Sequence, residues 1–134
     1  MDITINHTIV YCEDKESSAK WYSEIFGFEF IKVWGIFAVV RVNPSFTLDF
    51  KDALGDIFPQ HYAFKVNDKQ FDEILERLKS HEVKYCSDPF MFNDNNFDFN
   101  FNTKFGGRGV YFLDPNGHKL EILTSDYDLD GEFY

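Results

Sequence analysis

The sequence has little cysteine, little positive charge and no long apolar run. Its two cysteines, Cys12 and Cys86, are too few for a disulfide framework and lack the CxxC spacing of thiolate zinc sites. We therefore expect two ordinary reduced thiols. No stretch approaches the roughly 20 consecutive apolar residues that span a bilayer, and the N-terminus lacks the basic and apolar segments of a secretion signal. These absences predict a cytoplasmic protein with no membrane partner.

Positive charge is scarce because 13 Lys and Arg residues stand against 23 Asp and Glu residues, which gives a formal net charge of -10. A field of this sign repels phosphate backbones and anionic membrane surfaces. We therefore expect no nucleic-acid partner. Acidic residues are dense in the segment 125–134, which we predict to be a solvated tail.

Apolar and aromatic residues are plentiful. The chain of 134 residues contains 17 Phe, 7 Tyr and 2 Trp, and 44% of it is hydrophobic. This is enough apolar material for a core, which excludes disorder of the whole chain, and the length suits one compact domain. We therefore expect a single domain over residues 1–134.

The chain contains an internal repeat. Residues 7–15 align without a gap with residues 61–69, because in both a histidine opens an extended run and an Asp-Lys step leads into a helical pattern. Residues 36–50 align in the same way with residues 108–122, and each of these stretches reads as strand, turn and strand. Each copy therefore predicts one strand, one helix and three further strands.

The repeat predicts an α+β fold built from two tandem βαβββ modules. The first module covers about residues 3–50 and the second about residues 60–124. If one helix covers one face of each sheet, the opposite faces are free to form a curved sheet that lines a cleft.

Helix boundaries can also be read from the sequence. Apolar residues recur at helical spacing in residues 19–26 and again in residues 71–78. Gly27 is placed to end the first helix in a left-handed conformation. Asp68 is the candidate cap of the second helix.

The second copy carries an extra segment, residues 90–105. Within it Phe97, Phe99 and Phe101 alternate with polar residues, which predicts a strand with one aromatic face. Such a strand could be a lid over the cleft, a buried strand at a dimer contact, or an edge hairpin with no role in binding. The Asn-rich stretch 93–96 is turn-prone and suggests mobility.

The repeat places metal-binding residue types at matching positions. His7 aligns with His61, and Asp49 aligns with Glu121. Strand alternation puts His61, Asp49 and Glu121 on the face away from the predicted helices. Two imidazoles and one carboxylate suit an open site for a divalent first-row metal such as Zn, Ni, Mn or Fe, with Asp49 as an optional fourth ligand. We expect His118, in a Pro-Asn-Gly turn, to be solvated.

Further side chains on the predicted cleft face and on the extra segment are candidates for substrate contact. The strand of His7 carries apolar residues on the same face, so the cleft is expected to be partly apolar. The candidates are Ile9, Tyr11, Thr47, Lys65, Phe97, Phe99 and Phe101.

Four segments give the chain a family resemblance. They are residues 6–10 (NHTIV), 18–22 (SAKWY), 26–28 (FGF) and 111–122 (YFLDPNGHKLEI). With these segments the chain resembles the vicinal oxygen chelate superfamily, also called the glyoxalase, bleomycin-resistance and extradiol-dioxygenase superfamily, over nearly its whole length. The resemblance implies paired βαβββ modules and a homodimer in which the two modules complete a site.

The resemblance also implies residue roles. His7, His61 and Glu121 match the metal ligands of the family, and Asp49 stands where glyoxalase I usually has a glutamate. Because aspartate is shorter, Asp49 would more naturally support a ligand or act as a base, so Glu121 and Asp49 are the candidate catalytic residues. Fosfomycin-inactivating members tend to carry Thr at the position of Ile9, which counts against that activity. The ring-cleaving dioxygenases also need an acid-base group, and the sequence identifies none.

Two main hypotheses follow. The first is a metal-dependent isomerase, lyase or dioxygenase that chelates two neighbouring oxygens of a small substrate and stabilises an enolate or alkoxide. The alternative is a metal-free, bleomycin-resistance-like protein that binds a small molecule in an aromatic cleft. An interaction module without chemistry ranks third. Fold-level resemblance alone does not choose among them.

Overall fold

The chain folds into two compact units, each with one helix and one four-stranded sheet. The computed structural model describes residues 1–132. The first unit ends at Phe58 and the second begins at Pro59, and we call them the N-terminal and C-terminal modules. The two tandem βαβββ modules of an α+β fold are therefore confirmed. The cleft between them and the single domain over residues 1–134 stay predictions.

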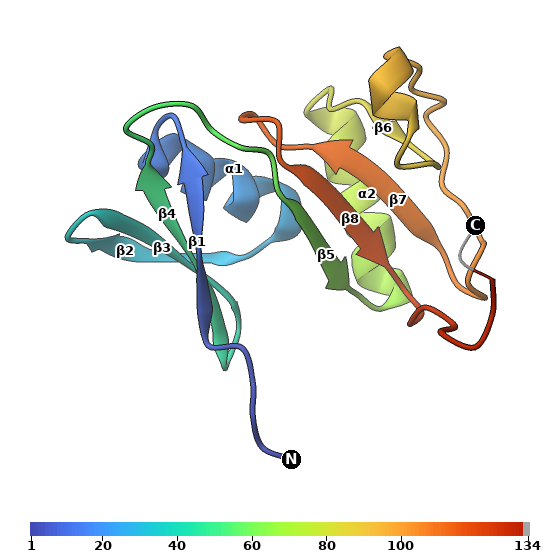
Figure 1. Cartoon of the computed structure of the whole chain (residues 1–134), viewed down its shortest axis with the longest axis horizontal. Coiled ribbons are helices and arrows are strands. Elements are labelled where there is room, and N and C mark those ends of the chain that lie inside the picture. The colour runs from blue at the N-terminus through green and yellow to red at the C-terminus, as the bar shows by residue number, and fades with distance from the viewer. Residues whose placement is uncertain (133–134) are drawn as a thin grey trace. The chain divides into compact units, whose positions relative to one another are not determined.

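The N-terminal module is a mixed sheet with one helix. Its strands are arranged in the order β1-β4-β3-β2, and β1 runs parallel to β4 while the other pairs are antiparallel (Figure 1). Its elements are β1 (His7–Cys12), α1 (Lys15–Phe26), β2 (Glu29–Trp34), β3 (Phe37–Asn43) and β4 (Phe46–Asp52).

The C-terminal module repeats this topology. Its strand order is β5-β8-β7-β6, with β5 parallel to β8 (Figure 1). Its elements are β5 (His61–Lys65), α2 (Asp68–Ser80), β6 (Tyr85–Cys86), the 3₁₀ helix η1 (Met91–Asp94), β7 (Gly109–Leu113) and β8 (Lys119–Leu123).

Local signals in the sequence set both helix boundaries. Hydrogen bonds from the side chain and the backbone of Ser17 lower the pKa of Asp14, which caps the start of α1. Gly27 ends α1 at φ 80° as predicted. The cap of α2 is Asn67, one residue before the expected Asp68, because Asn67 and Gln70 form a reciprocal capping box. No helix within residues 1–132 is long and apolar enough to cross a membrane.

The core of each module lies between its helix and one face of its sheet. In the N-terminal module the ring of Tyr22 on α1 lies 4.8 Å from that of Phe50 on β4. In the C-terminal module Phe71 on α2 is fully buried, as are Leu120 and Ile122 on β8. Because side chains alternate along a strand, the residues between these core positions point away from the helix.

The extra segment lies between β6 and β7, where the N-terminal module has only the tight turn between β2 and β3. The prediction of a strand at residues 97–101 is wrong, since this described stretch has no regular strand and Phe99 has φ 52°. Asp98 accepts hydrogen bonds from the backbone and hydroxyl of Ser87, and these local bonds hold the chain in an irregular path.

The three alternating phenylalanines consequently have three different neighbours. Their ring centroids lie 5.5, 5.4 and 5.7 Å from those of the partner rings, in the pairs Phe97 with Phe92, Phe99 with Tyr85, and Phe101 with Phe71.

Arg108 fastens the end of the extra segment to α2. Its guanidinium lies 4.3 Å from the ring centroid of Phe71 and 5.4 Å from that of Phe101. It also donates to Asp72 at 2.7 Å and to Asp68 at 3.2 Å, and the hydrogen bond to Asp72 is the main cause that raises the pKa of Arg108. A permanent charge on Arg108 therefore joins α2, the extra segment and the start of β7.

Both cysteines are free and fully buried. The thiol of Cys12 donates to the carbonyl of Lys51, and that of Cys86 to the carbonyl of Asp88. Burial raises the pKa of Cys86 to about 11. The expectation of two reduced thiols agrees with the absence of a disulfide between Cys12 and Cys86.

This burial predicts slow thiol chemistry. At pH 8 Cys86 stays protonated because its pKa lies well above that pH, and Cys12 is inaccessible, so a thiol reagent should modify the native protein far more slowly than the unfolded protein. Raising the pH toward 11 should speed the reaction of Cys86. The measurement is the rate at which thionitrobenzoate is released from DTNB, with and without guanidinium chloride. Equal rates in the native and unfolded protein would contradict it.

Candidate functional site

The C-terminal module brings two of the predicted ligands together. His61 opens β5 and Glu121 lies on the adjacent strand β8, two residues beyond Lys119, which is the register partner of His61. Strand alternation directs both side chains away from α2. The Nε2 atom of His61 lies 3.1 Å from Oε1 of Glu121.

The two side chains differ in exposure. The side chain of His61 is 47% exposed, whereas that of Glu121 is only 2% exposed. A carboxylate that is removed from water is destabilised unless hydrogen-bond donors or a cation compensate its charge. The environment of Glu121 must therefore supply positive groups or donors.

Tyr127 supplies a donor to Glu121. Its hydroxyl lies 2.7 Å from Oε1 and 2.6 Å from Oε2 of Glu121. The ring of Tyr127 packs on Phe105, with centroids 4.4 Å apart. The prediction of a solvated tail at 125–134 is therefore wrong for Tyr127, and residues 133 and 134 lie outside the described chain.

Sequence reasoning missed Tyr127, and no pattern marks it. It stands between Asp126 and Asp128 in a segment whose composition indicates a solvated end. Its role depends on a tertiary contact with a buried carboxylate.

The second ring nitrogen of His61 fixes its tautomer. Nδ1 lies 3.1 Å from the carbonyl oxygen of Lys119, which can only accept a hydrogen bond, so Nδ1 carries a proton. In the neutral imidazole Nε2 then presents a lone pair toward the carboxylate of Glu121. Two acceptors at 3.1 Å require a proton or a cation to bring them together.

The donor set fits a divalent metal. Imidazole nitrogen and carboxylate oxygen both bind first-row cations. Two ligand atoms that each lie about 2.1 Å from a metal, at about 90° to one another, are about 3.0 Å apart. The observed spacing between Nε2 of His61 and Oε1 of Glu121 agrees with this value.

A cavity of about 420 Å³ opens beside this pair, which is a size suited to a small molecule. Most of its wall is apolar or aromatic, and Lys119 contributes a positive charge. The residues that line it are Pro59, Gln60, His61, Pro89, Phe90, Tyr111, Lys119, Glu121 and Tyr127.

The extra segment reaches this cavity through residues other than those predicted. Phe90, where the segment begins, and the preceding Pro89 form part of the wall. The predicted Phe97, Phe99 and Phe101 are absent from the lining within the described chain and pack on the neighbours given above.

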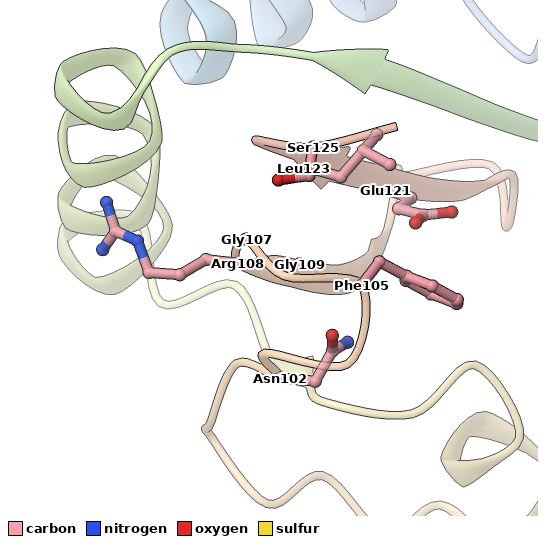
Figure 2. A pocket seen from close by; sticks show the side chains of 8 residues that line it. All are labelled: Asn102, Phe105, Gly107, Arg108, Gly109, Glu121, Leu123 and Ser125. Carbon is pink, nitrogen blue, oxygen red and sulfur yellow. The ribbon is translucent and has the colours of Figure 1, made fainter. Parts of the chain in front are cut away.

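A second, much smaller cavity lies behind Glu121. Its volume of about 10 Å³ leaves room for no more than about one water molecule. Figure 2 shows Glu121 and Phe105 pointing to one side of the strands, while Arg108 points the opposite way toward α2. Glu121 therefore borders both cavities.

His118 is buried, so the expectation that it is solvated is wrong. It is 1% exposed, and its Nδ1 accepts a hydrogen bond from the backbone N–H of Gln60 at 3.0 Å. Asp114 organises the turn by accepting from the backbone N–H of His118 at 2.9 Å. The turn thus holds the residue directly before His61.

In the N-terminal module, His7 and Asp49 lie on neighbouring strands. His7 is the register partner of Thr47, and Ile9 is that of Asp49. The hydroxyl of Thr47 donates to Oδ1 of Asp49 at 2.9 Å, and Nδ1 of His7 lies 2.7 Å from Oδ1 of its neighbour Asn6. Asp49 is 8% exposed, whereas His7 is exposed.

The remaining predicted contact residues are exposed, and two of them have charged neighbours. Tyr11 is 46% exposed and has the ammonium of Lys51 5.4 Å from its ring centroid. Lys65 forms an ion pair with Asp126 at 3.0 Å. Ile9 is 38% exposed.

Within residues 1–132, no three His, Cys, Asp or Glu side chains gather closely enough to hold a metal. The structure brings the predicted ligands together in one pair, His61 with Glu121.

Comparison with known proteins agrees with the fold. The family model described as "Glyoxalase/Bleomycin resistance protein/Dioxygenase superfamily" matches residues 4–122. A solved structure, oxidase ChaP-H2, is 41% identical, with a TM-score of 0.88 over 98% of this chain and 100% of that one.

Two curated relatives are more distant. The glutathione transferase FosA of Serratia marcescens is 27% identical over 89% of this chain and 79% of its own length. The metallothiol transferase FosB of Lysinibacillus sphaericus (strain C3-41) is 25% identical over 90% of this chain and 82% of its own.

The role of His118 can be tested by substitution. His118→Leu removes the acceptor for the Gln60 N–H and should lower the free energy of unfolding by about 1–3 kcal/mol. His118→Asn should lose less, because its Oδ1 can take the place of Nδ1. Urea unfolding followed by tyrosine and tryptophan fluorescence measures both. Equal losses in the two variants would show that the acceptor is unimportant.

Proposed function

Because the chain belongs to the glyoxalase/bleomycin resistance protein/dioxygenase superfamily, we propose that it is a divalent-metal-dependent enzyme that acts on a small substrate with neighbouring oxygen atoms. The observation that carries the proposal is the contact of 3.1 Å between Nε2 of His61 and the buried carboxylate of Glu121. This pair lies on the wall of a cavity large enough for such a substrate.

His61, Glu121 and His7 are the proposed metal ligands. His61 and Glu121 come from the C-terminal module, and His7 from the N-terminal module of this chain or of a second copy in a homodimer. The name of FosB, a metallothiol transferase, supports a metal in a relative of this chain. The identity of the metal among Zn, Ni, Mn and Fe is left to measurement.

An oxidase or dioxygenase reaction is favoured over the other chemistries of the superfamily. The chain shares 41% identity with oxidase ChaP-H2, compared with 27% and 25% with the two transferases. Ile9, at a position where fosfomycin-inactivating members tend to carry Thr, also counts against a transferase of that kind. Lyase and isomerase reactions are therefore the less supported alternatives.

The chain's own residues would bind and orient the substrate. Lys119 places a positive charge at the cavity wall, where it would attract an anionic substrate oxygen. Phe90 and Tyr111 offer apolar surface to the rest of the molecule. When bound, a divalent cation supplies Lewis-acid stabilisation of negative charge on the substrate oxygens. Asp49, held by Thr47, is proposed as a base.

Other residues of the expected substrate surface remain part of the proposal. Ile9, Tyr11 and Thr47 lie on the face of the N-terminal sheet that points away from α1. Lys65 lies on the corresponding face of the C-terminal sheet, where it is paired with Asp126.

A metal-free binding protein is the second candidate. It is favoured by the apolar and aromatic lining of the cavity and by the direct contact between His61 and Glu121, which a protonated imidazole would also make. In that case the cavity would hold its ligand by packing and by Lys119. Metal content decides between the two candidates.

Metal analysis is the test of the proposed function. Protein purified without a histidine tag should contain about one divalent metal per chain by inductively coupled plasma mass spectrometry. His61→Ala and Glu121→Gln should each lose most of it, because each removes a ligand. The matched control is His81→Ala, since His81 caps α2 at Arg77. Wild-type protein that holds no metal, even after incubation with each candidate cation, would overturn the proposal.

A further inference from the structure

The hydroxyl of Tyr127 lies at nearly equal distances from the two oxygens of Glu121. These distances are 2.7 Å to Oε1 and 2.6 Å to Oε2. A position close to both oxygens lies in front of the carboxylate, on the side from which a cation would have to approach to bind both oxygens at once. The phenol therefore occupies the bidentate position of Glu121.

The two oxygens of Glu121 are not equivalent. Oε1 lies within hydrogen-bond distance of both the Tyr127 hydroxyl and Nε2 of His61. Oε2 lies within hydrogen-bond distance of the Tyr127 hydroxyl. A cation could bind Nε2 of His61 and Oε1 without displacing the phenol from Oε2. Binding to both oxygens would require the phenol to leave.

The surroundings hold Tyr127 in this position. Its ring packs on Phe105 of the extra segment, with centroids 4.4 Å apart. The preceding residue, Asp126, is paired with Lys65 on β5 at 3.0 Å.

We infer that Tyr127 is a positioning residue that restricts Glu121 to binding the metal through Oε1 alone. Its phenol proton satisfies Oε2, so the carboxylate offers one oxygen beside His61 and leaves a coordination position for substrate. The extra segment takes part through Phe105, which supports the phenol. This inference rests on the proposed function, because it assigns a role toward the metal of that site.

Groups that hydrogen-bond a ligand orient it and are known to affect metal affinity by 10- to 100-fold. Tyr127→Phe keeps the ring on Phe105 and removes only the hydroxyl. We expect it to weaken binding of Mn²⁺ by roughly 10- to 100-fold, because an unrestrained carboxylate must be ordered when the metal binds. Isothermal titration of Mn²⁺ into metal-free protein gives this ratio.

A spectroscopic measurement separates positioning from a merely structural role. With Co²⁺ in place of the native metal, the visible absorption bands depend on the number and geometry of bound oxygens. Tyr127→Phe should change these bands, because the second oxygen of Glu121 becomes free to bind. The melting temperature of the metal-free protein should stay near that of the wild type.

Two further variants complete the design. Tyr85→Phe removes a phenol hydroxyl from β6, away from Glu121, and should change neither the Mn²⁺ affinity nor the Co²⁺ bands. Phe105→Leu leaves the phenol but weakens its support, so it should reduce Mn²⁺ affinity in the same direction and to a smaller extent.

The outcomes distinguish this inference from the proposed function. Wild-type protein that binds none of the candidate divalent cations, with Mn²⁺ and Co²⁺ included, would overturn both. Wild-type protein that binds them, together with a Tyr127→Phe variant of equal affinity and identical bands, would overturn the inference alone. Weaker affinity with altered bands in Tyr127→Phe, and neither change in Tyr85→Phe, would support it.

Discussion

The burial of the Glu121 carboxylate determines much of the arrangement in the C-terminal module. A charge that is only 2% exposed needs compensation, and the structure provides it from two other parts of the chain. His61 approaches from the neighbouring strand, and Tyr127 folds back from beyond the last strand. Tyr127 in turn needs a surface to pack on, which Phe105 of the extra segment supplies. One buried charge thus connects a strand pair, the chain after β8 and the segment that lengthens the second module.

Both ends of the extra segment lie close to the candidate site. It begins with Phe90, which together with the preceding Pro89 forms part of the wall of the larger cavity, and it ends with Phe105 against Tyr127. Between these points Phe101 packs on Phe71 of α2, and just after the segment Arg108 forms ionic contacts with the same helix. A segment that is held along its length is better suited to shaping a pocket than to opening and closing as a lid.

Periodicity and the repeat predicted the fold because they reflect local rules: alternation along strands, helical spacing, and a glycine at a left-handed helix end. The same alternation placed His61 and Glu121 on one face, and the structure brings them into contact. Tyr127 and His118 could not be found in this way. His118 is held by a hydrogen bond from Gln60, far away in the sequence, and Tyr127 by hydrogen bonds to the buried Glu121. The Pro-Asn-Gly turn and the acidic tail had suggested that both were solvated. The alternation of aromatic and polar residues at 97–101 predicted a strand that the structure does not contain. Hydrogen bonds from Ser87 to Asp98 hold this stretch in an irregular conformation instead.

The central claim is that His61 and Glu121 hold one divalent cation through Nε2 and Oε1. Anomalous X-ray diffraction at the absorption edge of the bound metal, from crystals of the native protein, tests this most directly. The account predicts one strong peak about 2.0–2.2 Å from both Nε2 of His61 and Oε1 of Glu121. A peak bound elsewhere, or a hydrogen bond between the two side chains with no peak in crystals grown with the metal, would contradict it.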